Sequence, residues 1–517
     1  MDRHSFLKWT GIILFIIGLI LIMSWPKILY YILTKGMILS HGSKVYEMWS
    51  KPPVPINMDV YLFNYTNPGQ LKEKDYKPHL VQMGPYRFRE FHEKVDVVFN
   101  ENHTVTYRQV RRWYHDAENS NGSLKDNVTT LNVLPIAASA VSRHWSGVLV
   151  YPLSAALSVA SRSLWLTRPV SEMLFDGYSD PLLSIASNIP GISALELPGD
   201  RIGFFYGRNG SAEFDGVFNM ETGAADISRL GEMRCWNYLN DSKLYEGECG
   251  RITGFAGELF PPGQTKNRPL KVFAVDLCRW VLFDFVEEVE VNDILGYRYA
   301  LSKTFLDNGT RNPDTECNCG GTCLPQGALN VSTCRKGAPA FASYPHFLDA
   351  DPYYTRNVQG LSPDPEKHRF HLTIEPTTGA VLDVAARLQI NIFLQPNERI
   401  SLLQNVPTMM FPMMWFEERA TISPELSASL RMVLRLPLIG IICSVCLLLL
   451  GLVLLGFAFL PRVVLLLLKK DPSSNYTRRA TNLQIASSKK TVKYLVTQDN
   501  KKAACRETED STLLDIK

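Results

Sequence analysis

Residues 317–323, CNCGGTC, and residues 327–334, GALNVSTC, hold four of the ten cysteines of the chain. A segment this rich in cysteine can bind a metal, take part in redox chemistry or form disulfides. Zinc requires thiolate pairs in C-x2-4-C spacing with a second pair or histidines, and Cys317-x-Cys319 does not have that spacing. The compartment in which the segment folds decides between disulfides and the other two, so the flanking chain has to be considered first.

Two long apolar segments enclose the middle of the chain. Residues 9–26 carry no acidic or basic side chain except at their border with Lys27, and the apolar pattern continues to residue 33. Residues 436–460 carry none at all. At about 1.5 Å per residue, the second segment spans roughly 37 Å, more than a hydrocarbon core of about 30 Å. A cleaved signal peptide is the alternative for the first segment, but its apolar part is too long and no small-x-small cleavage site precedes Trp25.

Basic residues predict the orientation of these two spans. Arg3 and Lys8 precede the first span, and Arg462, Lys469 and Lys470 follow the second. Because basic residues favour the cytosolic side, both termini are expected in the cytosol. The predicted organisation is a cytosolic tail at 1–8, a transmembrane helix at 9–33, an extracellular or lumenal domain at 34–435, a second transmembrane helix at 436–460 and a basic cytosolic tail at 461–517.

Glycosylation signals agree with this placement. The N-x-S/T sequons between the spans begin at Asn64, Asn102, Asn121, Asn127, Asn209, Asn240, Asn308 and Asn330. A sequon is a weak signal alone, but many within one segment indicate exposure to the secretory lumen. Cysteines in that oxidising compartment are expected to form disulfides rather than a metal site.

The domain between the spans has strand patterns along most of its length. Short β-branched and aromatic runs separated by turn residues predict hairpins near 96–110, near Asn209-Gly210 and across Thr378-Gly379. One large, mainly antiparallel sheet or barrel is therefore expected. Helical patterns concentrate in residues 131–188, which predicts a small helical bundle inserted between strands. Such an insertion either contacts a partner or only closes one end of the barrel.

The sequence shows no signature of catalysis. It lacks the G-x-S-x-G, H-E-x-x-H, P-loop and G-x-G-x-x-G motifs. His92-Glu93 is followed by Asp96 where a zinc-binding helix would need a second histidine. The net charge of +3 does not suggest a nucleic-acid partner. A protein that is not an enzyme and uses no cofactor or metal is expected.

Several short motifs, taken together in order, resemble one family. They are MGPYRF at 83–88, GYSDP at 177–181, the cysteine stretch, PHF at 345–347, GLSP at 360–363 with His368, IEPTTG at 374–379 and RLQIN at 387–391. With the two spans, they make the chain similar to the class B scavenger receptor family, which includes the fatty-acid translocase and the lysosomal integral membrane protein type two. The resemblance covers nearly all of residues 5–460.

The resemblance implies an α+β fold: an antiparallel β-barrel ectodomain with a helical bundle at its membrane-distal apex and an internal apolar tunnel. It also implies disulfides between Cys249 and Cys317, between Cys278 and Cys334, and between Cys319 and Cys323. The seven lumenal cysteines are an odd number, and Cys235 lies outside the family pattern. Cys235 is therefore the cysteine expected to stay out of these bridges.

Ligand binding in the family uses basic residues of the apical bundle, which here would be Arg143, His144, Arg162 and Arg168. A solvated helix face is the alternative reading of each of these arginines. An imidazole titrates near about pH 6.5, so His144 could make binding sensitive to pH.

The C-terminal tail contains a second signal. Glu509, Leu513 and Leu514 fit an acidic dileucine pattern, which resembles the sorting signal of the lysosomal member and predicts a clathrin adaptor as partner. Localisation in the plasma membrane and in endosomal or lysosomal membranes follows.

The leading functional hypothesis is a scavenger-type receptor that binds lipid, lipoprotein or protein cargo at the apical bundle and mediates endocytic uptake or passes lipid through the barrel. An adhesion or cargo-sorting receptor without lipid transfer is the alternative. A two-span ligand-gated channel subunit is a remote third, since neither span carries a polar residue suited to line a pore.

Overall fold

The computed structural model describes residues 3–73, 75–161, 163–186, 200–319 and 323–468. The chain divides into two compact units. One unit contains α1 as far as Lys35 and α8 from Ser429, and the other contains the chain from Gly36 to Ala428. The helices are α1 (Arg3–Met37), α2 (Lys44–Ser50), α3 (Val133–Val141), α4 (Gly147–Ala160), α5 (Pro181–Ala186), α6 (Tyr353–Arg356), α7 (Pro365–His368) and α8 (Pro424–Leu468).

The helices α1 and α8 are the two candidate membrane spans. Within them, Ser5–Met37 and Pro424–Leu460 are long and apolar enough to cross a bilayer. The two helices pack closely where glycines allow their backbones to approach. A Cβ atom added at Gly18 would lie 2.7 Å from the Leu448 nitrogen, and one at Gly451 would lie 2.6 Å from the Phe15 nitrogen. The spans expected at 9–33 and 436–460 fall inside these helices, which extend further at both ends.

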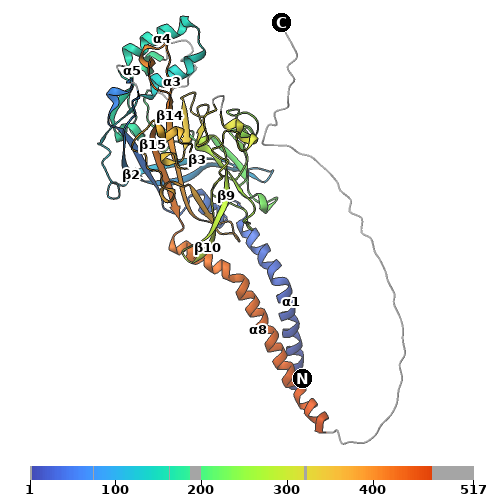
Figure 1. The fold of residues 1–517 in the computed structure, drawn as a ribbon. Helices are drawn as coiled ribbons and strands as arrows, with labels where there is room; N and C mark the ends of the chain where they lie inside the picture. The colour runs from blue at the N-terminus through green and yellow to red at the C-terminus, as the bar shows by residue number, and fades with distance from the viewer. Residues whose placement is uncertain (1–2, 74, 162, 187–199, 320–322, 469–517) are drawn as a thin grey trace. The chain divides into compact units, whose positions relative to one another are not determined.

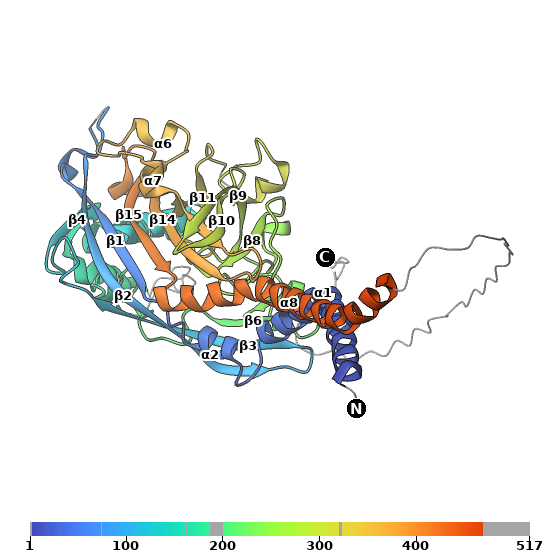
Figure 2. The same cartoon turned by 90° about the horizontal axis from the view of Figure 1, so that it is seen from below.

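The unit between Gly36 and Ala428 is organised around one 13-stranded antiparallel sheet. Along its main path the order is β7-β6-β3-β2-β1-β15-β14-β13-β10-β9-β8, and β12 adds β11 beside β14. The strands follow one another round a curved sheet (Figure 1, Figure 2). Their bounds are β1 (Ile56–Tyr65), β2 (Leu80–Phe99), β3 (Thr104–His115), β4 (Asn127–Leu131), β5 (Trp165–Pro169), β6 (Val217–Glu221), β7 (Met233–Trp236), β8 (Leu270–Ala274), β9 (Arg279–Val291), β10 (Ile294–Leu301), β11 (Ala328–Asn330), β12 (Ala340–Ser343), β13 (His371–Ile374), β14 (Val381–Leu394) and β15 (Met409–Thr421).

A short connecting segment joins the two edges of this sheet. Phe255 forms a bridge with Glu232, next to β7, and a second bridge with Val272 of β8. The Met233 nitrogen donates to the Gly254 carbonyl, and the Phe255 nitrogen donates to the Lys271 carbonyl. The sheet is thereby nearly closed into a barrel, as the sequence predicts, and the edge strands do not stay unpaired.

The helical segment lies at the end of the sheet away from the β9–β10 turn (Figure 1). It contains α3, α4 and α5 but is not purely helical, because Trp165–Pro169 forms β5 and pairs with β4. The hairpin expected near Asn209-Gly210 is wrong. Residues 203–215 form turns instead, in which Gly207 and Gly210 adopt positive φ angles, and Ile202 makes an isolated bridge with Tyr178.

Two glycines of the family motifs are required by close backbone contacts. A Cβ atom at Gly84, where φ is +108°, would lie 2.6 Å from the Val60 carbonyl oxygen. A Cβ atom at Gly360, where φ is +90°, would overlap the Leu80 carbonyl oxygen. A side chain at either position would push the neighbouring strand away, so steric fit explains both motif glycines.

Three disulfides involve the cysteine stretch, and two of them join it to segments earlier in the chain. They join Cys249 to Cys317, Cys278 to Cys334, and Cys319 to Cys323, the pairs that the resemblance implies. The first two close loops of 68 and 56 residues. Loops of this length remove considerable freedom from the unfolded chain, typically about 2–4 kcal/mol per bridge. Cys235 is buried and lies outside these bridges.

Candidate functional site: a cavity with a charged end

The barrel-like sheet encloses a cavity of about 480 Å³. Strands from both halves of the sheet line it, together with α2, the segment after α2 and the first turn of α8. Most of the lining is apolar, with Trp49, Phe273, Leu372, Val384 and Ala420 as examples. A volume of this size with a mostly apolar lining suits a small amphiphilic ligand.

One end of the cavity is polar. The polar lining residues are His92, Gln109, Arg111, Glu258, Asp276 and Glu418. Strand geometry explains why these groups converge. Side chains two residues apart share one face of a strand, so β2 directs Glu90, His92 and Lys94 to the same side. In the register of β2 with β3, His92 lies opposite Arg111.

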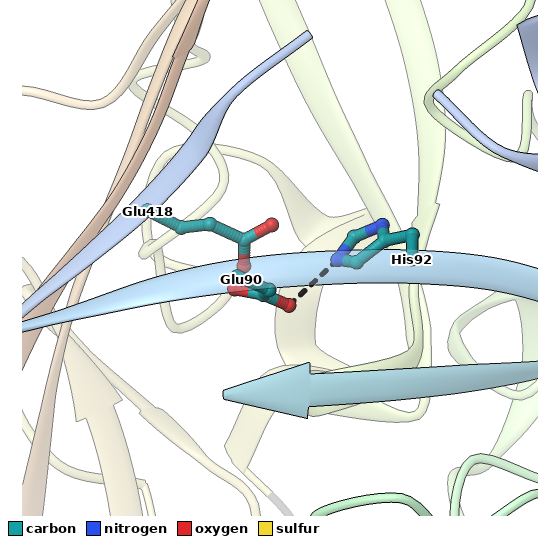
Figure 3. A group of neighbouring side chains, drawn as sticks. All are labelled: Glu90, His92 and Glu418. Carbon is teal, nitrogen blue, oxygen red and sulfur yellow. Dashed lines mark hydrogen bonds and ion pairs between the residues drawn. The ribbon is translucent and has the colours of Figure 1, made fainter. Parts of the chain in front are cut away.

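These residues belong to a larger buried charge cluster, joined throughout by ion pairs. Its members are Glu90, His92, Lys94, Arg111, Arg208, Asp215, Glu258, Asp276, Arg335 and Glu418. His92 Nε2 lies 2.6 Å from Glu90 Oε1 (Figure 3), and Lys94 Nζ lies 2.6 Å from Glu258 Oε1. Lys94 also hydrogen-bonds to Gln109.

Arg111 forms ion pairs with more acids than any other base of the cluster. Its Nη1 lies 3.6 Å from Glu90 and 3.5 Å from Glu418, and its Nε lies 3.3 Å from Asp215. Glu90, His92 and Glu418 bring their ligand-type atoms within 4.8 Å of one another and could in principle hold a metal ion. Since the guanidinium group of Arg111 already supplies the positive charge between the two carboxylates, a divalent cation would have to displace it. The donor set does not fit a metal site.

The protonation states follow from burial and charge. Burial is the main cause that raises the pKa of Glu418 to about 7; Glu90 adds to it, and Arg111 only partly offsets it. Burial alone would lower the pKa of His92, but its contacts with Glu258 and Glu90 outweigh that effect and raise it. Burial would likewise raise the pKa of Glu258, yet Lys94 and His92 lower it to about 2. With a pKa of about 7, Glu418 therefore changes protonation near neutral pH.

The predicted apical residues are not brought together as one site. Arg143 donates to the Pro396 carbonyl, and burial lowers its pKa, so this side chain is committed to packing. Arg168 lies on β5, not on a helix, pairs with Glu172 at 3.7 Å and lies over the Tyr178 ring. His144 is exposed. Arg162 lies outside the described residues, as do Glu509, Leu513 and Leu514 of the sorting signal.

The sequon asparagines differ in exposure. Asn102, Asn121, Asn127 and Asn209 are exposed, whereas Asn64, Asn240 and Asn308 are half-buried. Asn330 is buried, and its Nδ2 donates to the Cys319 carbonyl at 3.1 Å. Glycosylation at these sequons stays a prediction.

Sequence reasoning missed the charged end of the cavity. It considered His92 only as part of a zinc motif and did not consider Glu90, Arg111 or Glu418. The signal that could have found them is the alternation of Glu90, His92 and Lys94 within one strand. Charged side chains on the face that packs inward are unusual unless they pair with one another.

The fold and the cavity define a class of membrane protein in which two terminal helices flank a large barrel-like domain with a hollow interior. A family model described as the CD36 family matches residues 9–461. The chain belongs to the CD36 family, and the resemblance noted from its motifs is confirmed.

Individual proteins of known name are also similar to this chain over most of its length. Protein peste of Drosophila melanogaster is 39% identical over 430 residues, which cover 82% of this chain and 76% of that protein. Scavenger receptor class B member 1 of Bos taurus is 30% identical over 421 residues and 81% of each chain. Lysosome membrane protein 2 of Rattus norvegicus is 32% identical over 409 residues, 78% of this chain and 83% of that protein.

Proposed function

We propose that this protein is a scavenger-type membrane receptor, not an enzyme, that takes up lipid through the cavity in its barrel-like domain. The observation that carries the proposal is the cavity itself, which joins an apolar wall to a charged end. An amphiphile would place its chain along Trp49, Phe273 and Leu372 and its head near Glu418. Among the relatives, the scavenger receptor class B proteins have names that agree with a receptor.

In this proposal, cargo first contacts the helices α3 to α5, and lipid then passes through the interior toward the membrane. Both termini lie in the cytosol, and the acidic dileucine signal of the tail recruits a clathrin adaptor that routes the protein between the plasma membrane and endosomes or lysosomes. The name of lysosome membrane protein 2 is in keeping with that route.

A blocked cavity tests the proposal. Ala420 lines the cavity, so Ala420→Trp should fill part of it and reduce the uptake of a labelled lipid by cells to the level of cells without the chain. Ala224→Trp places the same side chain on an exposed turn and serves as the matched control. Surface abundance of each variant is measured in parallel. Normal uptake by correctly delivered Ala420→Trp would contradict lipid transfer through the cavity.

A cargo-sorting or adhesion receptor without lipid transfer is the second candidate. The specific observation in its favour is α4, which contains no charged residue although Val148, Tyr151 and Val159 are largely exposed. An uncharged, exposed helix face is suited to bind a partner. Replacing Val148 and Val159 by Ser would then abolish cargo binding, while Ala420→Trp would leave it intact.

A further inference from the structure

The charged end of the cavity has an uneven balance of acids and bases. Its acids are Glu90, Asp215, Glu258, Asp276 and Glu418, and its bases besides His92 are Lys94, Arg111, Arg208 and Arg335, counted here as cations. With His92 protonated, full ionisation of the acids gives a neutral cluster. Protonation of one acid in addition leaves one net positive charge facing an apolar space, where charge interactions are strong.

Glu418 is the acid placed to take up that proton. It lines the cavity, and its side chain is 24% exposed, whereas Glu90 is fully buried. Its cation is Arg111 at 3.5 Å, which also pairs with Glu90, Asp215 and Asp276. Asp276, by contrast, has Arg208 at 2.7 Å. Glu418 therefore receives only a share of one guanidinium group and is the weakest-paired acid that reaches the cavity.

We infer that Glu418 is a headgroup-selecting residue: in its protonated form, beside Arg111, it holds the anionic head of a single-chain amphiphile, and its ionisation expels that head. This inference rests on the proposed function, because it assumes that the cavity holds lipid. The neutral carboxyl group would donate its proton in a hydrogen bond to an oxygen of the ligand, and Arg111 would supply the compensating charge.

Binding then takes up one proton from solution and breaks no covalent bond. Two carboxylates a hydrogen-bond length apart cannot both stay ionised, so a bound carboxylate and Glu418 share one proton. Burial already raises the pKa of Glu418 to about 7, and a bound anion would raise it further. Affinity for an anionic head should therefore rise as the pH falls through 7, which favours retention in acidic compartments and release at neutral pH.

The test compares three amphiphiles that share one alkyl chain with a diazirine at its end: palmitic acid, hexadecanesulfonate and palmityl alcohol. Each is cross-linked to the full-length protein in lipid nanodiscs, and labelled peptides of the cavity wall are quantified by mass spectrometry. The sulfonate stays ionised throughout, so its pH dependence reports the protein alone. Because Glu418 has a pKa of about 7, labelling by the sulfonate should rise about tenfold from about pH 8 to about pH 5.5. The alcohol should show no such rise.

Glu418→Gln imitates the protonated carboxyl group. It should label with the sulfonate at pH 8 nearly as strongly as the original protein does at pH 5.5, and its labelling should change with pH far less than that of the original protein, because His92 is then the group that still titrates there. Glu290→Gln, on an exposed position of β9, should keep the original pH dependence. An equal pH response of the original protein and Glu418→Gln would overturn the inference and leave lipid binding intact. Absence of cavity labelling by all three amphiphiles would instead overturn the proposed function.

Discussion

Two groups of titratable side chains in the barrel-like domain are stabilised by different interactions. The charge cluster around Arg111 pairs ions with ions and opens onto the cavity. The second group, His346 and His368, stacks its rings at 4.5 Å and is held by neutral hydrogen bonds. The Ser362 nitrogen donates to His346 Nδ1, and the Asp364 nitrogen donates to His368 Nδ1. A ring nitrogen that accepts from a backbone N–H carries no proton, so both rings are neutral.

The histidine pair and Glu418 therefore contribute to stability with opposite pH dependences. Burial lowers the pKa of His346 and of His368 to about 4, so the unfolded chain binds these protons first and stability falls as the pH drops from about 6.5 to about 4. Burial raises the pKa of Glu418 to about 7, so the folded chain binds this proton first and stability falls as the pH rises from about 4.5 to about 7. In both cases burial disfavours the charged form of the side chain. The charged form of histidine is the protonated one, so burial lowers its pKa, whereas the charged form of glutamate is the deprotonated one, so burial raises its pKa.

Removing the shared cation should have the largest effect. Arg111→Met removes the cation paired with Glu418 and one of the positive groups beside Glu90 and Asp215, which should cost about 3–5 kcal/mol. Most of the protein should then fail to reach the cell surface, as measured by surface biotinylation. Arg112→Met, at the next residue along β3, removes a half-buried pair with Glu93 and should cost below about 1 kcal/mol. Similar losses in both variants would contradict the central role of Arg111.

The histidine pair should determine the loss of stability in acid. His368→Asn keeps an acceptor for the Asp364 nitrogen but cannot titrate. Relative to its own value at pH 7.5, its stability at pH 5 should exceed that of the original protein by about 2 kcal/mol. Thermal unfolding of the full-length protein in nanodiscs at several pH values measures this difference. Parallel pH profiles for the two proteins would show that His368 is protonated in the folded chain.

Glu418→Gln should have an effect of the opposite sign. The variant should be more stable than the original protein by about 3 kcal/mol at pH 8, where the carboxylate is ionised at an energetic cost, and nearly equally stable at about pH 4. The same unfolding measurement detects it, with Glu290→Gln as control. A stabilisation that is undiminished at about pH 4 would have to come from packing instead of ionisation.

Salt should have the smallest effect. Both groups are buried, so raising the ionic strength to about 0.5 M should leave the two pH profiles in place, although it screens exposed pairs. A shift of the Glu418 profile with salt would indicate that bulk solvent reaches the cluster, and the contrast between the two regions would then weaken.

Much of the fold can be predicted from local patterns. The hairpin near 96–110 and the pairing across Thr378-Gly379 are both present, as β2 with β3 and β13 with β14. The closure of the sheet by Phe255 was not predictable, because a single bridging residue has no periodic signal. The strand β5 lies within residues 131–188, where only a helical bundle is predicted, for a related reason. Its pairing with β4 joins segments 38 residues apart in sequence, as between Thr129 and Thr167.

Less of the candidate site can be predicted. The cysteine pairs follow from the family resemblance, but spacing alone leaves their connectivity open. The cavity end combines Glu90 from β2, Arg111 from β3 and Glu418 from β15, and only the assembled sheet brings them together. Of the expected apical residues, Arg143 donates to the Pro396 carbonyl, a contact between distant segments that no local pattern shows, and ligand binding by the apical residues stays a prediction. Whether a charged side chain is exposed or paired decides its role in the cavity and in the apical segment, and sequence patterns show neither property.

The central claim is that the cavity holds an amphiphile with its head at Glu418. Electron cryomicroscopy of the full-length protein in nanodiscs at about pH 5.5, with palmitic acid added, tests this most directly. The account predicts elongated density along Trp49 and Leu372 that ends within hydrogen-bond distance of Glu418 and Arg111. Density for the acid at another place, with the cavity empty, would contradict it.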